Sequence, residues 1–498
     1  MIILLCCILV RVLFLGFVPS GINQDEAYIG YEAFSLAKYG IDSWGYTNPC
    51  YFISWGSGMN VFYAYLLRCF FMILGYEDWV LRFPQAVVSV LGCLAFYCML
   101  KKGYGKKVAL FGFFIISVMP WNIMNARWGL ESAMLPSCLM IAVWLWVKAF
   151  DDIKYLYFSF IGFGICFYIY AVSWVFLAIY LPLLVIYFWW YNKDKWIHLW
   201  AGGLVLSVFA LPLLWFLLVN TYSFDEYKGA LFLVPRLIYW RGNEWGSENF
   251  DIKLWAIYNI FILQDKVTIR EVIPGIGLFY DKYWLLFILG FIGLVLDIKK
   301  NGFRAKCSVF ILIWFVVGGI YVSLLYSSGT RVNLMYMPVM LILALSAKLL
   351  FRYKWVGYSV VLIYLCLFVN FCCVYFGKYD EIAQDYFSVG FKEALKEANK
   401  VHKDRFYDVV IVDEPTVYPK ILWYEKINPR DFMKTIYWRY EVNAYMEPLS
   451  FLHYKFIYDF NYNMIEKDKI YIVDKKLHYF FYDFEKKEFG KYLLAIPR

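Results

Sequence analysis

The sequence is poor in charged residues and in histidine, and it has no spacing typical of a metal or disulfide framework. Charged residues make up 17% of the 498 positions, whereas 62% are hydrophobic and 22% are aromatic. A soluble domain needs far more charge, so this composition indicates a polytopic membrane protein. Twelve cysteines and four histidines form no CxxC or Cys–His spacing. The sequence therefore supports neither a disulfide scaffold nor a zinc site.

Long apolar segments fill the first three quarters of the chain. A helix needs roughly 20 apolar residues to cross a bilayer. We expect about eleven transmembrane helices, the first of them a retained span, because no small-residue cleavage site follows it. The expected spans are 2–18, 83–100, 108–120, 133–149, 155–171, 174–191, 198–218, 283–297, 307–326, 335–351 and 355–375.

The chain has a net charge of +9, and its lysines and arginines cluster in short loops between these spans. Cytoplasmic loops carry an excess of lysine and arginine, which predicts a cytoplasmic N-terminus and an extracytoplasmic C-terminus in the cell membrane. Nothing in this distribution calls for a nucleic acid partner. The basic loop residues are Lys101, Lys102, Lys106, Lys107, Lys193, Lys195, Lys299, Lys300, Arg304, Lys306, Lys348, Arg352 and Lys354.

The expected topology divides the chain into a transmembrane domain, 1–377, and an extracytoplasmic domain, 378–498. Two outer loops, 19–82 and 219–282, belong to the first domain. In the tail the apolar runs shorten to strand length, as in VVIVD and KIYIVD, and GFKEALKEANK has the pattern of an amphipathic helix. We expect a small α/β domain of roughly 120 residues, a usual domain size.

A pair of adjacent acids, Asp25 and Glu26, follows the first apolar segment within the helix-forming stretch NQDEAYIGYEAFSLAKYG. Asn23 and Glu26 have the spacing of a capping box, so Glu26 could be structural. Asp25 could be a first-turn acid favoured by the helix dipole. It could equally be a proton acceptor just beyond the membrane surface. Both interpretations stay open at this point.

Arginines are predicted at the same outer ends of the spans. Arg127 and Glu131 are four residues apart and would share one face of a helix, as a surface ion pair or as part of a site. Arg82 opens the second span and could simply extend to the interface. Arg331 and Asn333 lie at the mouth of the tenth span. Because guanidinium groups suit phosphate, the acids and arginines together indicate transfer from a lipid-phosphate-linked sugar.

The chain resembles the bacterial glycosyltransferase family 39, which is related to protein O-mannosyltransferases and to the aminoarabinose transferase of lipid A. Members of this family have the GT-C fold. The resemblance covers about residues 1–350, and the tail resembles the generic outer domain of many members. It rests on Asp25-Glu26, Arg82-x-Pro84, Pro120-Trp121 through Arg127 and Glu131, Pro274-Gly275 through Tyr280, and Arg331 with Asn333.

The resemblance implies inverting transfer of a sugar from a polyprenyl-phosphate donor to a hydroxyl group of a lipid, a cell-wall glycan or a protein. Asp25 would be the general base, Glu26 would orient it or the acceptor, and Arg127 and Arg331 would hold the donor phosphate. No cofactor is required, although some relatives bind a divalent metal near the acidic loop. No MIR-type β-trefoil is visible in 219–282, which separates the chain from the eukaryotic enzymes. The supporting residues would be Glu131, Arg82, Asn333 and Tyr28.

Two other functions fit a polytopic chain with an outer domain. A transporter or flippase of a lipid-linked precursor would place polar groups near the bilayer midplane and show repeated halves. Here the ionisable residues lie at the outer ends of spans and no internal repeat is evident. A non-catalytic scaffold would carry the acid pair without any turnover.

Overall fold

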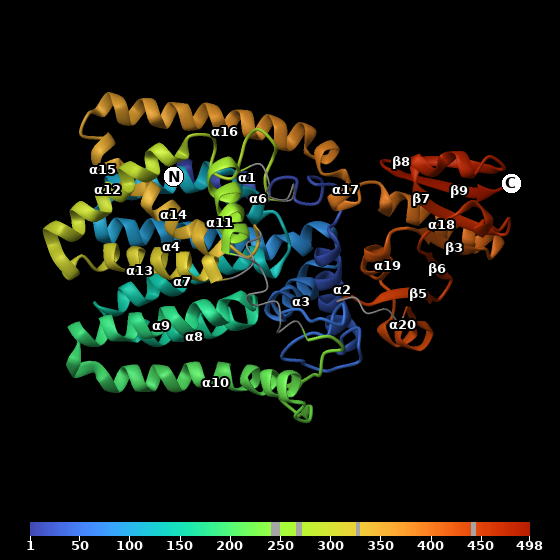
Figure 1. Ribbon diagram of the computed structural model, residues 1–498, viewed down its shortest axis with the longest axis horizontal. Helices are drawn as coiled ribbons and strands as arrows, with labels where there is room; N and C mark the ends of the chain where they lie inside the picture. Colours follow the sequence, from blue (N-terminus) through green and yellow to red (C-terminus); the bar gives the residue numbers. More distant parts are fainter. Residues whose placement is uncertain (241–249, 265–270, 325–328, 440–444) are drawn as a thin grey trace. The chain divides into compact units, whose positions relative to one another are not determined.

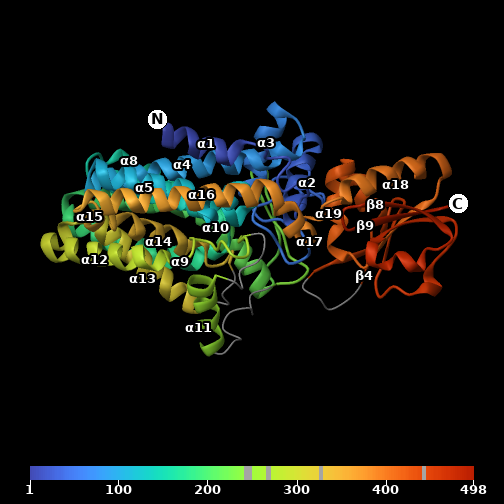
Figure 2. The same cartoon turned by 90° about the horizontal axis from the view of Figure 1, so that it is seen from above.

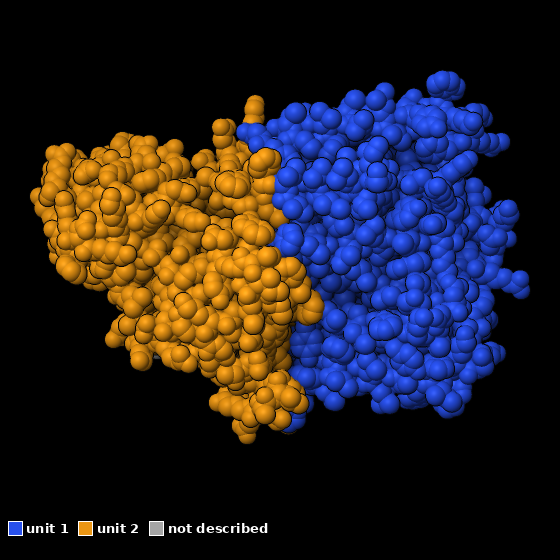
Figure 3. Space-filling view, turned by 180° about the vertical axis from the view of Figure 1, so that it is seen from behind, with its two compact units in different colours: residues 1–13, 82–218, 242–377 blue, residues 14–81, 219–241, 378–498 orange. Residues whose placement is uncertain are grey.

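The structure is a computed structural model that describes residues 1–240, 250–264, 271–324, 329–439 and 445–498. The described chain forms two compact units, which are coloured separately in Figure 3. Unit 1 contains residues 1–13, 82–218 and 242–377, and unit 2 contains residues 14–81, 219–241 and 378–498. Unit 2 thus combines the tail with the first outer loop. The predicted division at residue 377 stays a prediction.

Unit 1 is helical, and its long helices run beside one another in both Figure 1 and Figure 2. Helices α4, α10 and α16 each continue for a few residues into unit 2. The elements are α1 (Ile2–Val12), α4 (Asp78–Tyr104), α5 (Lys106–Val118), α6 (Pro120–Ala126), α7 (Glu131–Ala149), α8 (Lys154–Ile169), α9 (Val172–Tyr191), η1 (Lys193–Lys195), α10 (Trp196–Tyr222), α11 (Phe250–Tyr258), η3 (Asn259–Leu263), α12 (Tyr283–Asn301), η4 (Gly302–Arg304), α13 (Lys306–Leu324), α14 (Asn333–Leu345), α15 (Ala347–Leu350) and α16 (Lys354–Ile382).

Every expected span overlaps at least one of these helices, although 335–351 covers both α14 and α15 and the first span is helical only over α1. Among the described residues, seven helices are long and apolar enough to cross a membrane, or eight if the bent pair α5–α6 is a single span. Helices α1 and α8 are apolar but shorter, and α12 ends on a charged stretch. Residues 325–326 of one expected span, and 241–249 and 265–270 of the second outer loop, lie outside the described residues.

The centre of unit 1 is α14, which is buried along almost its whole length, whereas α10 and α16 expose most of their apolar surface. Apolar exposure on this scale fits contact with lipid hydrocarbon, since a soluble protein rarely exposes patches so large. Gly290 of α12 makes the close packing on α14 possible. A Cβ atom at Gly290 would lie 1.8 Å from the carbonyl oxygen of Ile342.

A buried arginine stabilises the break between α5 and α6, whose axes differ by 62°. Arg11 of α1 is fully buried. Its guanidinium donates to the carbonyl oxygens of Ile116 and Ser117, each at 3.3 Å, and to the side chain of Asn122. Its Nε donates to Ser89 Oγ at 3.2 Å. These bonds supply partners for carbonyl groups in the last turn of α5, which have no partner within that helix.

Unit 2 joins two helices of the first outer loop to the α/β tail. Its other elements are short strands and helices, most of them beyond residue 383. The elements are α2 (Gln24–Tyr39), α3 (Phe62–Leu74), β1 (Tyr227–Lys228), β2 (Leu233–Val234), α17 (Gln384–Phe387), α18 (Phe391–Arg405), β3 (Asp408–Val412), η5 (Pro415–Val417), α19 (Tyr418–Glu425), α20 (Pro429–Thr435), β4 (Tyr437–Arg439), β5 (Glu447–Phe451), β6 (Tyr454–Ile457), η6 (Tyr462–Met464), β7 (Lys469–Asp474), η7 (Lys475–Phe480), β8 (Phe484–Phe489) and β9 (Tyr492–Pro497).

The described tail contains a seven-stranded sheet in the order β4-β5-β6-β3-β7-β9-β8. Strand β3 lies parallel to both β6 and β7, and the outer pairs are antiparallel. Helix α18 packs on β3, β7, β8 and β9. The predicted strands at 409–413 and 469–474 are β3 and β7, and the predicted helix at 390–400 is α18. The α/β character of the tail is therefore confirmed.

Replacing Arg11 with methionine should destabilise unit 1, because the carbonyl groups at the end of α5 would lose their donors. Buried acceptors left without a partner cost about 1–3 kcal/mol each, so we expect a loss of about 3 kcal/mol. The change would be measured as a lower Tm of the purified protein in detergent. Arg304→Met, at an exposed position, is the matched control. Equal Tm values for the two variants would contradict this role of Arg11.

Candidate active site

The acid pair lies in the first turn of α2, where a complete capping box fixes its geometry. The side chain of Asn23 accepts the backbone N–H of Asp25 at 2.9 Å, and Glu26 Oε2 accepts the backbone N–H of Asn23 at 3.1 Å. Glu26 is fully buried, whereas Asp25 is half-buried. The structural interpretation of Glu26 is thus confirmed. The carboxylate of Asp25 takes no part in the box.

The tail packs directly against this turn, which the sequence did not indicate. Asn23 Nδ2 donates to the carbonyl oxygen of Tyr386 at 3.3 Å, and the backbone N–H of Ser20 donates to Asp380 at 2.9 Å. Gly21 approaches the backbone of the tail so closely that a Cβ atom there would lie 2.0 Å from the carbonyl oxygen of Phe387. The position of the acid pair therefore depends on residues more than 350 positions away.

Tyr28, a predicted supporting residue, belongs to a buried polar network on α2. Its hydroxyl lies 3.0 Å from Ser43 Oγ, and Ser43 also donates to Glu32 through its hydroxyl and, at 2.8 Å, its backbone N–H. Burial, followed by the charge of Asp42, raises the pKa of Glu32, and burial raises the pKa of Asp42. Glu32 was not predicted from the sequence. Its spacing of seven residues from Asp25, which puts both on one face of a helix, was an available signal.

Aromatic rings from the outer loop and the tail surround this network. The ring of Trp55 lies 5.4 Å from that of Tyr28 and 5.1 Å from that of Tyr418. Trp44 and Trp438 stack with their ring centroids 5.8 Å apart, and both are half-buried. Aromatic rings beside hydrogen-bonding carboxylates can hold a sugar ring or a similar amphipathic group.

Unit 1 contains the predicted donor-binding residues. Arg127 is buried, and its Nη1 donates to the carbonyl oxygens of Val10 at 3.1 Å and Leu13 at 2.6 Å. Its Nε donates to the hydroxyl of Tyr375 at 3.3 Å, and its guanidinium lies 5.0 Å from the ring of Phe376. These contacts give Arg127 a structural role at the end of α1. Its role in binding phosphate stays a prediction.

The expectation that Arg127 and Glu131 share a helix face was wrong. Helix α6 ends at Ala126 with Arg127 as its C-cap, and α7 begins only at Glu131. The helical spacing assumed an unbroken helix, but the backbone leaves the helical path between these residues, at a stretch that includes Gly129. Glu131 itself is buried in the first turn of α7.

The sequence suggested that Arg82 could extend to the membrane interface. In the structure its side chain is buried instead. It lies close enough to Arg127 for the two positive charges to interact. Arg331 is half-buried and precedes α14. Asn333 connects three helices, since it accepts from Trp121 Nε1 and donates to the carbonyl oxygen of Ser132, both at 3.1 Å. These bonds help to position α14, and its supporting role in the site stays a prediction.

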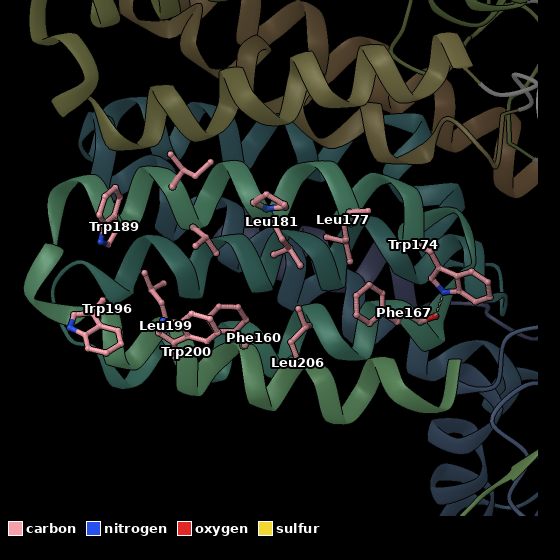
Figure 4. A pocket seen from close by; sticks show the side chains of 15 residues that line it. Phe160, Phe167, Trp174, Leu177, Leu181, Trp189, Trp196, Leu199, Trp200 and Leu206 are labelled. Atoms are coloured by element: carbon pink, nitrogen blue, oxygen red, sulfur yellow. Dashed lines mark hydrogen bonds between the residues drawn. The ribbon is translucent and has the colours of Figure 1, made fainter. Parts of the chain in front are cut away.

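The described residues contain no group of three or more histidine, cysteine, aspartate or glutamate side chains that could hold a metal ion. A cavity of about 770 Å³ lies between α8, α9 and α10 (Figure 4). Its lining is apolar and includes Trp174, Trp189, Trp196 and Trp200. Such a cavity suits hydrocarbon and offers no group for acid–base chemistry.

Comparison with known proteins agrees with this architecture. A family model described as dolichyl-phosphate-mannose-protein mannosyltransferase matches residues 60–215. The protein named "Putative mannosyltransferase YkcB" from Bacillus subtilis (strain 168) is 32% identical over 78 residues, which are 16% of this chain and 11% of that protein. The chain therefore matches only about a tenth of this curated relative.

Among solved structures, ArnT from Cupriavidus metallidurans bound to undecaprenyl phosphate is similar with a TM-score of 0.60 and 11% identity. The match covers 99% of this chain and 97% of that chain. The same protein in the apo state gives a TM-score of 0.60 and 10% identity. The similarity confirms the expected GT-C fold over the tail as well as the helices. Together with the family match, it confirms the resemblance to glycosyltransferase family 39.

The raised pKa of Glu32 predicts how stability depends on pH. A carboxyl group that binds its proton more tightly in the folded state stabilises the protein at low pH, and this contribution is lost as the pH rises above the ordinary value of 4.5. Glu32→Gln is neutral at every pH, so its Tm should fall less than that of the wild type between pH 5 and pH 8. The exposed Glu393→Gln is the control. Parallel Tm profiles for the wild type and Glu32→Gln would contradict the prediction.

Proposed function

We propose that this chain, a GT-C protein similar to glycosyltransferase family 39, transfers a sugar from a polyprenyl-phosphate donor to a hydroxyl acceptor outside the cytoplasm. The main support is the half-buried Asp25, which lies in the first turn of α2, the helix that follows the apolar α1 in the sequence. The family match over 60–215 and the GT-C fold support the reaction class. The solved relative with undecaprenyl phosphate bound supports a lipid-linked donor.

Asp25 is the general base in this proposal. The acceptor oxygen attacks the anomeric carbon of the sugar as its proton passes to the Asp25 carboxylate. The bond from the anomeric carbon to the phosphate oxygen breaks, and polyprenyl phosphate leaves with the electron pair. A single displacement of this kind inverts the anomeric configuration. The N-terminus of α2 favours the ionised form of Asp25, which is the form that accepts a proton.

Positive charge must stabilise the leaving phosphate as the bond breaks. Arg331 is the better candidate for direct contact, because it is half-buried at the start of α14. Arg127 and Arg82 are buried and contribute mainly through their charge.

The predicted membrane orientation completes the proposal. The lysine-rich loops, among them Lys101–Lys102 and Lys299–Lys300, lie on the cytoplasmic side, as does the N-terminus. The tail and the acid pair then lie outside the cytoplasm, where the hydroxyl acceptor is found. The protein is a multi-pass membrane protein in either orientation, because seven of its described helices can span a bilayer.

Asp25→Asn should abolish transfer while the protein stays folded, because the amide cannot accept the proton of the acceptor. The loss should be at least about 100-fold, within the usual range for a general base. The assay is the release of free polyprenyl phosphate from a panel of polyprenyl-phosphate sugars, with membrane extract as the source of acceptors. The exposed Asp404→Asn is the matched control. Full activity in Asp25→Asn would exclude the base assignment.

The conservative variant Glu26→Gln separates the two acids. Glutamine can also complete a capping box, so this variant should keep most of its activity if Glu26 only fixes the turn. A loss as large as that of Asp25→Asn would instead give Glu26 a direct part in the reaction.

Arg331→Gln should weaken the use of the donor more than that of the acceptor. Loss of a charge-assisted contact to phosphate costs about 1.5–3 kcal/mol, so kcat/KM for the donor should fall at least about tenfold. Steady-state kinetics with the donor and acceptor varied in turn would measure this difference, and Arg304→Gln is the control. An unchanged donor kcat/KM would remove Arg331 from the phosphate site.

A further inference from the structure

A pocket of about 160 Å³ lies in the tail, between the segment that joins β6 to β7 and the segment that leads into β8. Pockets for drug-sized molecules have volumes of about 300–1,000 Å³, so this one suits a smaller group such as a single ring. We call it the Tyr482 pocket. Its lining includes Tyr462, Tyr482, Phe480, Ile465, Lys467 and Asp483, none of which takes part in the proposed reaction.

The inner side of the Tyr482 pocket belongs to the hydrophobic core of the tail. Phe480 and Ile465 pack against the buried cluster that β3, β7, β8 and β9 form. The hydroxyl of Tyr471, in β7, accepts the backbone N–H of Glu466 at 2.7 Å and so holds the segment before that strand. A pocket whose walls are fixed in this way loses little conformational freedom when it binds a ligand.

The rim of the pocket carries two exposed tyrosines. Tyr462 is 46% exposed and Tyr482 is 60% exposed. Their rings are nearly parallel, at 16° with centroids 6.3 Å apart, and their hydroxyls form a hydrogen bond of 2.8 Å. The ring of Phe480 lies 6.3 Å from that of Tyr462. A sugar ring has apolar C–H faces and a polar edge, so it matches flat rings that end in hydroxyl groups.

Two opposite charges complete the lining. The Nζ of Lys467 lies 3.3 Å from Oδ2 of Asp483, and both side chains are exposed. Such a pair contributes little to stability, so its groups can turn to a ligand at small cost. An ammonium donates hydrogen bonds and a carboxylate accepts them, whereas a sugar hydroxyl does both. The two charges cancel, and an anionic ligand would be repelled by Asp483, so the lining favours a neutral ligand.

We propose that the Tyr482 pocket binds a neutral saccharide, with one sugar ring against the tyrosine rings and its hydroxyls bonded to Lys467 and Asp483. The consequence for catalysis rests on the proposed function. There the pocket retains one sugar unit of the acceptor, while a hydroxyl elsewhere on the same acceptor receives the transferred sugar. This assigns the acceptor to the glycans, from among the lipids, glycans and proteins that the resemblance allows.

Saturation-transfer NMR on the full-length protein tests the binding step without any need for turnover. The protein is kept in a detergent that has no sugar head group. The probes are neutral oligosaccharides of glucose, mannose, galactose and N-acetylglucosamine. Saturation of the aromatic protons should reach at least one of them. In Tyr482→Ala the Kd of that oligosaccharide should rise about tenfold, because an apolar ring is lost from the contact.

Two further variants show whether the ring itself is responsible. Tyr482→Phe keeps the ring and should keep most of the affinity. Tyr437→Ala is the matched control, since Tyr437 is an exposed tyrosine on β4, at the other end of the sheet from β8. This variant should bind as the wild type does. The exposed positions of both tyrosines make all three variants compatible with folding.

No transfer to any of the oligosaccharides, or the same Kd in the wild type and Tyr482→Ala, would overturn the proposal. Binding of an aromatic peptide in place of every saccharide would also overturn it. As an acceptor, the bound oligosaccharide should show a higher KM and an unchanged kcat in Tyr482→Ala, because the pocket is remote from the reacting hydroxyl. Failure of the proposed function would appear differently, as Tyr482-dependent binding without Asp25-dependent release of polyprenyl phosphate.

Discussion

Two buried arginines connect α1 to the broken helix α5–α6 by hydrogen bonds in both directions. Each arginine donates to carbonyl groups at the end of the opposite helix. Arg11 of α1 donates to the last turn of α5, and Arg127, just after α6, donates to Val10 and Leu13 at the end of α1. A bilayer offers no water to replace such partners, so an interrupted helix must find them within the protein. The 62° bend between α5 and α6 therefore depends on α1.

This exchange determines which residues lie at this end of unit 1. Because the chain leaves helical geometry after α6, Arg127 points back into the protein and Glu131 begins a new helix. Asn333 and Gln85 then hold the segment from both sides, the latter by donating to the carbonyl oxygens of Asn125 and Ala133.

The sequence predicted features that depend on local pattern and missed those that depend on long-range contact. The helices, the capping box at Asn23 and the strands of the tail follow from hydrophobic period and turn chemistry, and they were predicted. The predicted shared helix face of Arg127 and Glu131 was wrong, because the spacing of four residues holds only within an unbroken helix. The burial of Arg82 and the packing of the tail on the start of α2 depend on segments distant in sequence.

Helix α2 holds two acids in opposite environments, and this contrast argues for Asp25 as the base. At the start of the helix, the positive end of the helix dipole favours a carboxylate. Two turns further on, burial and Asp42 favour the protonated form of Glu32, which hydrogen-bonds to Ser43. A site that separates its carboxyl groups in this way can assign them different tasks. In the proposed reaction Asp25 receives the proton, whereas Glu32 belongs to the network with Ser43 and Tyr28 that lies beside the aromatic residues.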